Sequence, residues 1–379
     1  MMKVLFCSPH SDAPEVVKGG INTWGRYVMA YYTQYVKDGV EVIPVSFDRF
    51  SDVGENQLAL ARILSGLREY MGTVKKTIKL MDIEKPQMAH ICTCAGLGLF
   101  RDLFLLKEAR RRGIKTAVHL HFGRIPELAK KRNWEWKLLS KVLRMCDVTV
   151  VMNRPSEKVL DEEGFKNVTY LPNPLGMSAL DVIRSAEGQY ERIPRRLLYC
   201  GHVIRTKGMM ELVEGCCRIP NIELRIVGKC TPDIKDEMLS IAAKSGEDTS
   251  WMSFVGEVTH DDVIREFFQA DMFVFPSYTE GFPNVIMEAM ACGCPIVSSD
   301  VGAIPEMLDM DGDPCGICFK PQSADEVNYA IKSLIDNKDL KSSFAAKAKA
   351  RVNNLYAMPK VWEKMVSIWR NEYSQKNEG

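Results

Sequence analysis

The sequence predicts an α/β protein built from two doubly wound, Rossmann-like domains. Apolar runs of strand length alternate with amphipathic stretches of helix length, and no hairpin signals separate them, a pattern typical of parallel sheets. The prolines of Leu171-Pro172-Asn173-Pro174-Leu175 interrupt this alternation, which then restarts. A length of 379 residues also fits two domains. Because ligands bind at the carboxyl ends of parallel strands, two such domains facing each other would enclose an interdomain cleft.

The first domain is predicted to span residues 1–175. Its expected strands are short apolar runs, buried on both faces of a sheet: Lys3–Cys7, Val40–Ser46, Met88–Cys92, Thr116–His121, Val148–Met152 and Val168–Leu171. Its expected helices are the amphipathic stretches Thr23–Lys37, Asn56–Met81 and Phe100–Arg112.

The second domain is predicted to span residues 190–360. Its expected strands are Leu197–Cys200, Glu223–Val227, Met252–Val255, Met272–Pro276, Pro295–Ser299 and Ile317–Phe319. Its expected helices are Gly208–Arg218, Asp233–Ala243, Asp261–Gln269, Pro283–Ala291 and Ala324–Asn337. A last helix is expected within residues 361–379, where Val361–Tyr373 carries apolar residues on one face.

The composition is that of a soluble globular protein, with 46% hydrophobic and 26% charged residues. No run of 18 apolar residues predicts a transmembrane helix. Twelve cysteines and a short apolar N-terminus favour a reducing cytoplasm over a secreted disulfide framework.

The charge is uneven along the chain. Residues 1–175 hold 27 basic and 19 acidic residues, and segment 101–144 alone holds 13 and 4. Such a segment attracts polyanions or an anionic membrane surface, or it is simply a solvated helix face. Trp134 and Trp136, beside Lys130-Lys131-Arg132, are either part of an interfacial helix or ordinary surface and core residues.

The segment Phe275–Gly293 is the most informative part of the chain. It predicts a buried strand, a polar loop with Gly281, and a helix with Pro283 near its first turn. Free amides at a helix start bind anions such as a diphosphate. The carboxylates of Glu280 and Glu288 would then hold hydroxyls on either side of that diphosphate, or else they are ordinary acidic residues of a buried helix.

This segment resembles a known signature. The pattern P-S-x-x-E-G-F-P-N-V-x-x-E-A-M-A-x-G-x-P, continued through Asp300–Glu306, is similar to that of the retaining nucleotide-sugar glycosyltransferases of family four, which have the GT-B architecture. The resemblance implies that Glu288 binds the nucleotide ribose and that Glu280 lies against the donor sugar near the reaction centre. It implies donor contacts for Gly281, Phe282, Pro283, Asn284 and Val285. It also implies that the last helix packs back on the first domain.

Three further groups of residues match the family in part. Lys207, before Gly208, matches the cation that holds the donor diphosphate, whereas His202 stands where the family has an arginine, so Arg205 is expected to contribute the second cation. Gly19 and Gly20 resemble the family's Gly-Gly loop at donor phosphates and acceptor, although alone they also fit a flexible turn. His121, at a strand end, matches a histidine beside the donor sugar, and His119 is expected to be a core residue; both also fit structural roles.

We therefore expect a retaining glycosyltransferase that moves a sugar from a UDP or GDP sugar to an acceptor hydroxyl, in cell-surface polysaccharide or glycolipid synthesis. The first domain would bind a sugar or lipid-linked acceptor and the second the donor. Catalytic roles fall on Glu280, Lys207 and His121, with no metal, no added cofactor and no nucleic acid partner. The expected location is the cytoplasm, peripherally at the inner face of the membrane. The alternatives are a nucleotide-sugar 2-epimerase and a non-catalytic sugar-nucleotide or polyanion-binding module.

Overall fold

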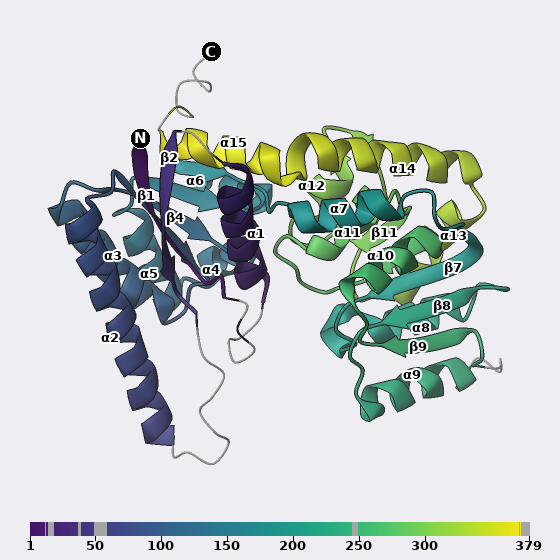
Figure 1. Ribbon diagram of the computed structural model, residues 1–379. Coiled ribbons are helices and arrows are strands. Elements are labelled where there is room, and N and C mark those ends of the chain that lie inside the picture. Colours follow the sequence, from purple (N-terminus) through teal and green to yellow (C-terminus); the bar gives the residue numbers. More distant parts are fainter. Residues whose placement is uncertain are drawn as a thin grey trace. The chain divides into compact units, whose positions relative to one another are not determined.

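The computed structural model describes residues 1–11, 13, 19–36, 39–48, 59–244, 249–370 and 372, with side chains omitted for 59–69 (Figure 1). The chain forms two compact units. The first comprises Met1–Gly176 and Met358–Gly379, and the second comprises Met177–Ala357. Asn56, where one helix was predicted to begin, and Tyr373, where the last was predicted to end, lie outside the described residues.

The first unit contains a six-stranded parallel sheet in the order β2-β1-β3-β4-β5-β6. Its strands are β1 (Met2–Ser8), β2 (Val40–Ser46), β3 (Met88–Thr93), β4 (Lys115–Leu120), β5 (Val148–Val151) and β6 (Val168–Tyr170). Its helices are α1 (Gly20–Tyr35), α2 (Ala59–Glu84), α3 (Gly98–Arg111), α4 (Ile125–Lys131), α5 (Trp134–Leu143), α6 (Arg154–Glu162) and α15 (Met358–Trp369).

Alternation along the strands divides the first core between the two faces of the sheet. Leu5 and Ile91 belong to a cluster that also contains side chains of α2, α3 and α5. Their neighbours Phe6 and His90 contact Trp24 of α1, which lies next to α15 on the other face (Figure 1). Strands β1 and β3 therefore bury both of their faces, as the inner strands of an all-parallel sheet do.

The second unit contains another six-stranded parallel sheet, in the order β14-β11-β10-β7-β8-β9. Its strands are β7 (Ile193–Cys200), β8 (Glu223–Val227), β9 (Met252–Gly256), β10 (Ala270–Phe275), β11 (Ile296–Ser299) and β14 (Ile317–Phe319), with a small hairpin of β12 (Asp309–Met310) and β13 (Asp313–Pro314). Its helices are α7 (Met177–Ala186), α8 (Met209–Cys216), α9 (Pro232–Lys244), α10 (His260–Gln269), α11 (Asn284–Ala291), α12 (Ile304–Leu308), α13 (Ala324–Ile335) and α14 (Lys338–Arg351), with a 3-10 turn at Arg205–Lys207 and a π turn at Val352–Tyr356.

The predicted fold class is confirmed: all twelve expected strands are present, each within four residues of its predicted bounds. Several helices were not predicted. Helix α7 occupies Met177–Ala186, just after the proline break, because Ala179, Leu180 and Ile183 form one buried stripe on it. None of the helices in the described ranges is both long and apolar enough to cross a lipid bilayer.

Candidate functional site

The carboxyl edge of the second sheet carries the residues that match the family signature. Strand β10 ends at Phe275, a loop carries Glu280 and Gly281, and α11 begins at Asn284. Phe282 is 5% exposed and packs edge-on against Tyr356. No side chain caps the first turn of α11, and the turn contains no acidic residue. The amide of Ile286 donates to the carbonyl of Pro283 over 3.2 Å, whereas those of Asn284 and Val285 have no partner among the described residues and are available to an anion.

Gly302 fixes the loop that carries Glu280. It has a φ of +59°, and a Cβ there would lie 2.2 Å from the carbonyl oxygen of Glu280. This close approach lets the amide of Ala303 donate to the carbonyl of Gly281 over 3.0 Å. The segment Asp300–Glu306, which extends the family signature, thus has a local structural reason to contain glycine.

A second glycine positions Lys207. Gly208 has a φ of +72°, and a Cβ there would lie 2.1 Å from the carbonyl oxygen of Pro276. The amide of Tyr278 also donates to the carbonyl of Thr206 over 3.0 Å. These contacts bring the two loops together, and Lys207 Nζ forms an ion pair with Glu280 Oε1. The side chains of Lys207 and Glu280 are 25% and 13% exposed.

Glu288 lies in the second turn of α11. The sequence patterns did not predict its hydrogen-bond partner. His260, at the first position of α10, places its Nε2 atom 3.2 Å from Glu288 Oε1. This hydrogen bond and the carboxylate charge raise the pKa of His260. Twenty-eight residues separate the pair, so no local pattern marks it.

The two candidates for a second cation differ in their surroundings. Arg205 forms an ion pair with Glu237 of α9 and is largely exposed. His202 is exposed, and within the described ranges its ring has no hydrogen-bond or ion-pair partner. Neither residue contacts Lys207 or Glu280 in a recorded polar interaction.

The remaining predicted residues belong to the first unit. Gly19 and Gly20 lie at the start of α1, and a Cβ at either would meet no described atom within 4 Å. The fold itself therefore does not require glycine at these two positions. In contrast, a Cβ at Gly25 would lie 2.0 Å from the carbonyl oxygen of Pro9, so this glycine serves packing of α1 on β1. Lys18, quoted with the same motif, lies outside the described residues.

His121 follows the last residue of β4 and completes a group of three histidines. Trp369 Nε1 donates to His90 Nδ1 over 3.0 Å, and His90 Nε2 lies 3.3 Å from His119 Nδ1. A neutral His90 that accepts at Nδ1 carries its proton at Nε2 and donates it to His119. Burial lowers the pKa values of His90 and His121 to about 3. The Nε2 atom of His121 has no partner among the described residues.

The group also contains a possible set of metal ligands. His90, Cys92 and His119 have ligand atoms within 4.8 Å of one another, and all three are buried. Both ring nitrogens of His90 are, however, occupied by Trp369 and His119. Burial also raises the pKa of the Cys92 thiol well above its usual value, which opposes formation of the thiolate that binds metals. We therefore interpret this group as a structural link between α15 and the sheet.

Comparison with known sequences identifies the second unit. Residues 194–337 match the family described as Glycosyl transferases group 1. The chain is 25% identical over 187 residues to the capsular polysaccharide biosynthesis glycosyltransferase CapM of Staphylococcus aureus, covering 48% of this chain and 47% of CapM. It is 34% identical over 104 residues to the O-antigen chain mannosyltransferase B of Escherichia coli, covering 27% and 26%. The chain thus matches about half or less of the length of these curated relatives.

Solved structures match the whole chain. Sucrose-phosphate synthase from Thermosynechococcus elongatus has a TM-score of 0.70 at 16% identity, covering 99% of this chain and 100% of that one. The HepE protein of Anabaena, solved with UDP, has a TM-score of 0.67 at 16% identity, covering 98% and 100%. These likenesses establish the GT-B fold, and the family match places residues 194–337 of this chain in the glycosyl transferases group 1 family.

Proposed function

We propose that this protein is a retaining glycosyltransferase that transfers a sugar from a nucleotide-diphospho-sugar to an acceptor hydroxyl. The observation that carries the proposal is the grouping of Lys207, Glu280 and Glu288 at the carboxyl edge of the second sheet, beside the uncapped start of α11. This edge is where doubly wound sheets bind nucleotides. The UDP in the HepE structure supports a nucleotide diphosphate as the leaving group.

In the proposed reaction, the acceptor oxygen bonds to the anomeric carbon as the bond between that carbon and the donor phosphate breaks. The acceptor proton passes to the departing phosphate, and attack on the same face retains the anomeric configuration. Lys207 and the amides of α11 stabilise the negative charge that develops on the phosphate. Glu280 binds sugar hydroxyls through the oxygen that Lys207 does not occupy, and Glu288 binds the ribose.

We propose that this chemistry needs no divalent metal. The positive charge of Lys207, with a contribution from Arg205, and the helix amides take the place that a metal has in other nucleotide-sugar enzymes. Transfer should then persist after dialysis against EDTA.

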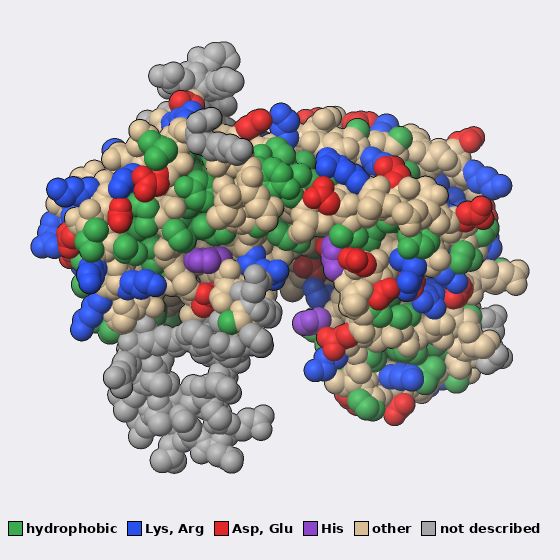
Figure 2. All heavy atoms as spheres, in the orientation of Figure 1, with side chains coloured by type: hydrophobic (Ala, Val, Ile, Leu, Met, Phe, Trp, Pro, Cys, Tyr) green, Lys and Arg blue, Asp and Glu red, His purple; other side chains and the backbone are tan. Residues whose placement is uncertain are grey.

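The first unit is proposed to bind the acceptor and to dock on an anionic membrane in the cytoplasm. Phe100, Phe104 and Trp134 are about half exposed, and Leu97 is 72% exposed. Glu135, next to Trp134, accepts from the amide of Gly96, which brings the start of α5 close to the turn before α3. Lys and Arg side chains are visible on the side of this unit that carries α2 and α3 (Figure 2).

The structure also reduces the number of residues in the basic segment 101–144 that are available to contact a membrane. Trp136 is 4% exposed and belongs to the core, so Trp134 is the tryptophan of the pair that could meet a membrane. Arg101 is buried and paired with Asp102. Three acidic residues outside the segment, Asp82, Asp147 and Glu163, pair with its basic residues. The charge available to a membrane is therefore smaller than the sequence count indicates.

Radiolabelled UDP and GDP sugars, assayed with and without neutral and lipid-linked acceptors, test the function. We expect acceptor-dependent transfer with the anomeric configuration retained, detected by NMR of the product. Conversion of the donor without any acceptor would favour the 2-epimerase. Nucleotide binding without turnover on any acceptor would favour the non-catalytic module.

Co-sedimentation with anionic and neutral vesicles at low and high salt tests membrane docking of the first unit. Binding should be specific to anionic vesicles and should weaken as the salt concentration rises.

A further inference from the structure

The two carboxylates of the family signature are held by different partners. Glu280 pairs with Lys207, whereas Glu288 Oε1 lies 3.2 Å from Nε2 of His260. Because an ionised carboxylate only accepts hydrogen bonds, His260 carries a proton on Nε2 and donates it to Glu288. His260 lies outside the residues that match the signature, so the signature does not explain its presence at this edge.

Both members of this pair stand on firmly packed helices. Thr259 caps α10, and its Oγ1 accepts from the amide of Asp262 over 3.3 Å. Ile264 and Phe267 of α10 and Met287 of α11 are fully buried, and the two helices are in contact. The backbones that carry the pair are thus fixed, and the bond between the two side chains determines how the carboxylate is turned.

The bond leaves most of the carboxylate available to a ligand. An ionised carboxylate has about four lone-pair sites, and His260 uses one of them. No bond to Glu288 Oε2 from a described residue is recorded, and this atom is not among the buried polar atoms without a partner, so it reaches solvent. A carboxylate that is fixed in advance loses less conformational freedom when it binds hydroxyls.

The charged groups around His260 favour its protonated form. The hydrogen bond to Glu288, the charge of that carboxylate and the charge of Asp261 raise the pKa of His260 against the opposing effect of burial. Asp262, one residue further on, pairs with Arg265 over 2.9 Å. An imidazolium paired with a carboxylate adds no net charge to this edge, so its effect should act on Glu288 and not as a general attraction for phosphate.

The other ionisable groups near the pair should keep their charge over the range in which His260 titrates. Cys200, at the end of β7, interacts with the charge of Glu288, and burial raises the pKa of its thiol to about 12. Glu266 of α10 is buried and paired with Arg225. The undescribed residues 245–248 precede the amino end of β9, whereas His260 follows its carboxyl end.

We propose that His260 is a positioning residue of the donor site, which turns the free lone pairs of Glu288 toward the ribose hydroxyls of the nucleotide. This role rests on the proposed function, because it requires the nucleotide to bind at this edge. The imidazolium forms the stronger, charge-assisted bond. Neutral His260 donates a weaker bond, and its tautomer with the proton on Nδ1 donates none to Glu288. The nucleotide therefore binds most tightly at the pH values where His260 is protonated.

Calorimetric titration of UDP, or of GDP if the chain binds that nucleotide, tests this role at pH 6 and pH 8.5. His260→Ala should raise the dissociation constant about fivefold at pH 6. His260→Gln keeps an N–H donor without the charge, so it should raise the constant about threefold at pH 6 and leave it unchanged at pH 8.5. Each variant is compared with the wild type at the same pH, because the terminal phosphate of the nucleotide also titrates near neutral pH.

Two controls accompany these titrations. Arg265→Gln, at an exposed position of the same helix, should bind the nucleotide as the wild type does. Inorganic diphosphate, which has no ribose, should bind His260→Ala and the wild type equally. A loss of diphosphate affinity as large as the loss of nucleotide affinity would overturn the role in ribose binding.

The Glu288→Ala variant separates positioning from direct contact. In that variant, His260→Ala should change the dissociation constant of the nucleotide less than about 1.5-fold, because the carboxylate that His260 turns is absent. An effect of His260→Ala that is as large without Glu288 as with it would mean that His260 contacts the nucleotide itself. That result would overturn the positioning role.

Two further measurements respond to positioning and not to a merely structural role. The nucleotide should raise the proton affinity of His260 about threefold in an NMR titration of its ring, because linkage between proton and nucleotide is reciprocal. In steady-state transfer, His260→Ala should raise the donor KM and leave kcat unchanged, since the ribose contact is present in both the ground state and the transition state. An unchanged proton affinity of His260 in the complex would contradict the proposal.

The outcomes separate this inference from the proposed function. Equal nucleotide binding by the wild type, His260→Ala and His260→Gln at pH 6 would reject the role of His260 and leave the transferase proposal standing. If neither UDP nor GDP binds the wild type, the donor assignment fails and the role of His260 fails with it. Thermal melting verifies that each variant is folded. If His260→Ala does not fold, His260→Gln and the NMR titration of the wild type decide the question.

Discussion

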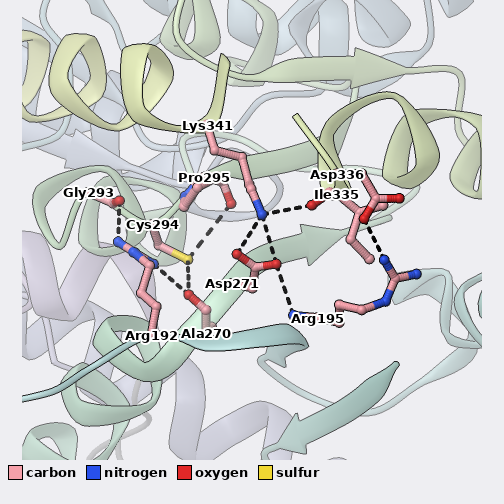
Figure 3. Close-up of polar contacts among 10 residues, drawn as sticks. All are labelled: Arg192, Arg195, Ala270, Asp271, Gly293, Cys294, Pro295, Ile335, Asp336 and Lys341. Atoms are coloured by element: carbon pink, nitrogen blue, oxygen red, sulfur yellow. Dashed lines mark hydrogen bonds and ion pairs between the residues drawn. The ribbon is translucent and has the colours of Figure 1, made fainter. Parts of the chain in front are cut away.

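The two edges of the second sheet use similar residues for different purposes. At the amino edge, Lys341 Nζ donates to both oxygens of Asp271, over 2.7 Å and 2.9 Å, and to the carbonyl of Ile335 over 2.7 Å (Figure 3). The amide of Arg195 also donates to Asp271 Oδ2, and Arg192 Nη1 donates to the carbonyl of Ala270 over 2.5 Å. Every proton of this ammonium group is thus in use, and both oxygens of the carboxylate are occupied.

At the carboxyl edge the pairs are simpler and more open. Among the described residues, Lys207 forms an ion pair with Glu280 alone, and one oxygen of Glu288 is bonded to His260. Lys341 and Asp271 are 12% and 10% exposed, whereas Lys207 and His260 are 25% and 42% exposed. An ion pair whose donors and acceptors are all in use holds helices and strands together. A pair that keeps unused donors and acceptors can exchange its partner for a ligand.

The largest expected effect is the loss of stability when the network of Asp271 and Lys341 at the amino edge is broken. Asp271→Ala leaves the buried ammonium of Lys341 without its counter-charge and should lower the free energy of unfolding by about 3–5 kcal/mol. Urea denaturation of the variant measures this loss. The double variant with Lys341→Met should recover part of the stability, because it removes the isolated charge. UDP affinity of the folded variant should stay unchanged; a large loss of affinity with intact stability would contradict the structural assignment.

Lys207→Ala should show the opposite pattern. The loss of a charge-assisted contact to the diphosphate should lower the transfer rate about 100-fold or more. Its effect on stability should be small beside that of Asp271→Ala, since Lys207 holds one partly exposed ion pair. Steady-state kinetics and denaturation curves measure the two effects. Lys332→Ala, at an exposed position of α13, is the control. Wild-type transfer by Lys207→Ala would remove this residue from the donor site.

Glu288→Ala is expected to raise the dissociation constant of UDP about tenfold, the loss of roughly one hydrogen bond to the ribose. Calorimetric titration of UDP and of inorganic diphosphate separates ribose from phosphate contacts. UDP binding should weaken and diphosphate binding should not. Equal affinity of UDP for the variant and the wild type would reject the ribose assignment.

Much of this second unit could be predicted from the sequence. Apolar runs report burial on both faces of a sheet, so they located β8 and β14 at their observed bounds. The glycines near Lys207 and Glu280 reflect local backbone requirements, namely the positive φ of Gly208 and Gly302 and their close contacts with carbonyl oxygens. Information of this kind is carried by neighbouring residues, so it can be recognised in a linear pattern.

Pairing between distant residues could not be predicted in the same way. His260 meets Glu288, and Asp271 meets Lys341, across 28 and 70 residues, because the sheet order places β10 between β7 and β11. In the first unit, the burial of Trp136 and the chain from Trp369 through His90 to His119 depend equally on the packing of helices on the sheet. Sequence periodicity predicts which face of a helix or strand a residue lies on, but not which distant residue it contacts.

Substitution of Arg205 tests whether this residue also contributes to donor binding at the carboxyl edge. Its pair with Glu237 is exposed, so its contribution to donor binding should be modest. At pH 8, Arg205→Ala should weaken UDP binding about threefold. Glu237→Gln is the matched variant: it releases Arg205 and should maintain or improve affinity. Unchanged affinity and turnover of Arg205→Ala at pH 8 would show that it does not replace the missing arginine.

The smallest expected effect concerns the pH dependence of the pair between His260 and Glu288. The carboxylate raises the pKa of His260 above its unfolded value near 6.5, so the folded state holds this proton more tightly. The stabilisation is therefore complete below about pH 6.5 and is lost as the pH rises through the raised pKa. Because His260 is 42% exposed and screened by solvent, it should amount to about 0.5 kcal/mol at most.

The melting temperatures of the wild type and of His260→Gln, compared from pH 6 to pH 9, measure this contribution. The difference between the two proteins should shrink as the pH rises, and Glu288→Gln should remove it at every pH, because the charge that raises the pKa is then absent. A difference that grew with pH would mean that neutral His260 is the form that holds Glu288, and the carboxyl edge would then be organised by a neutral hydrogen bond and not by charge.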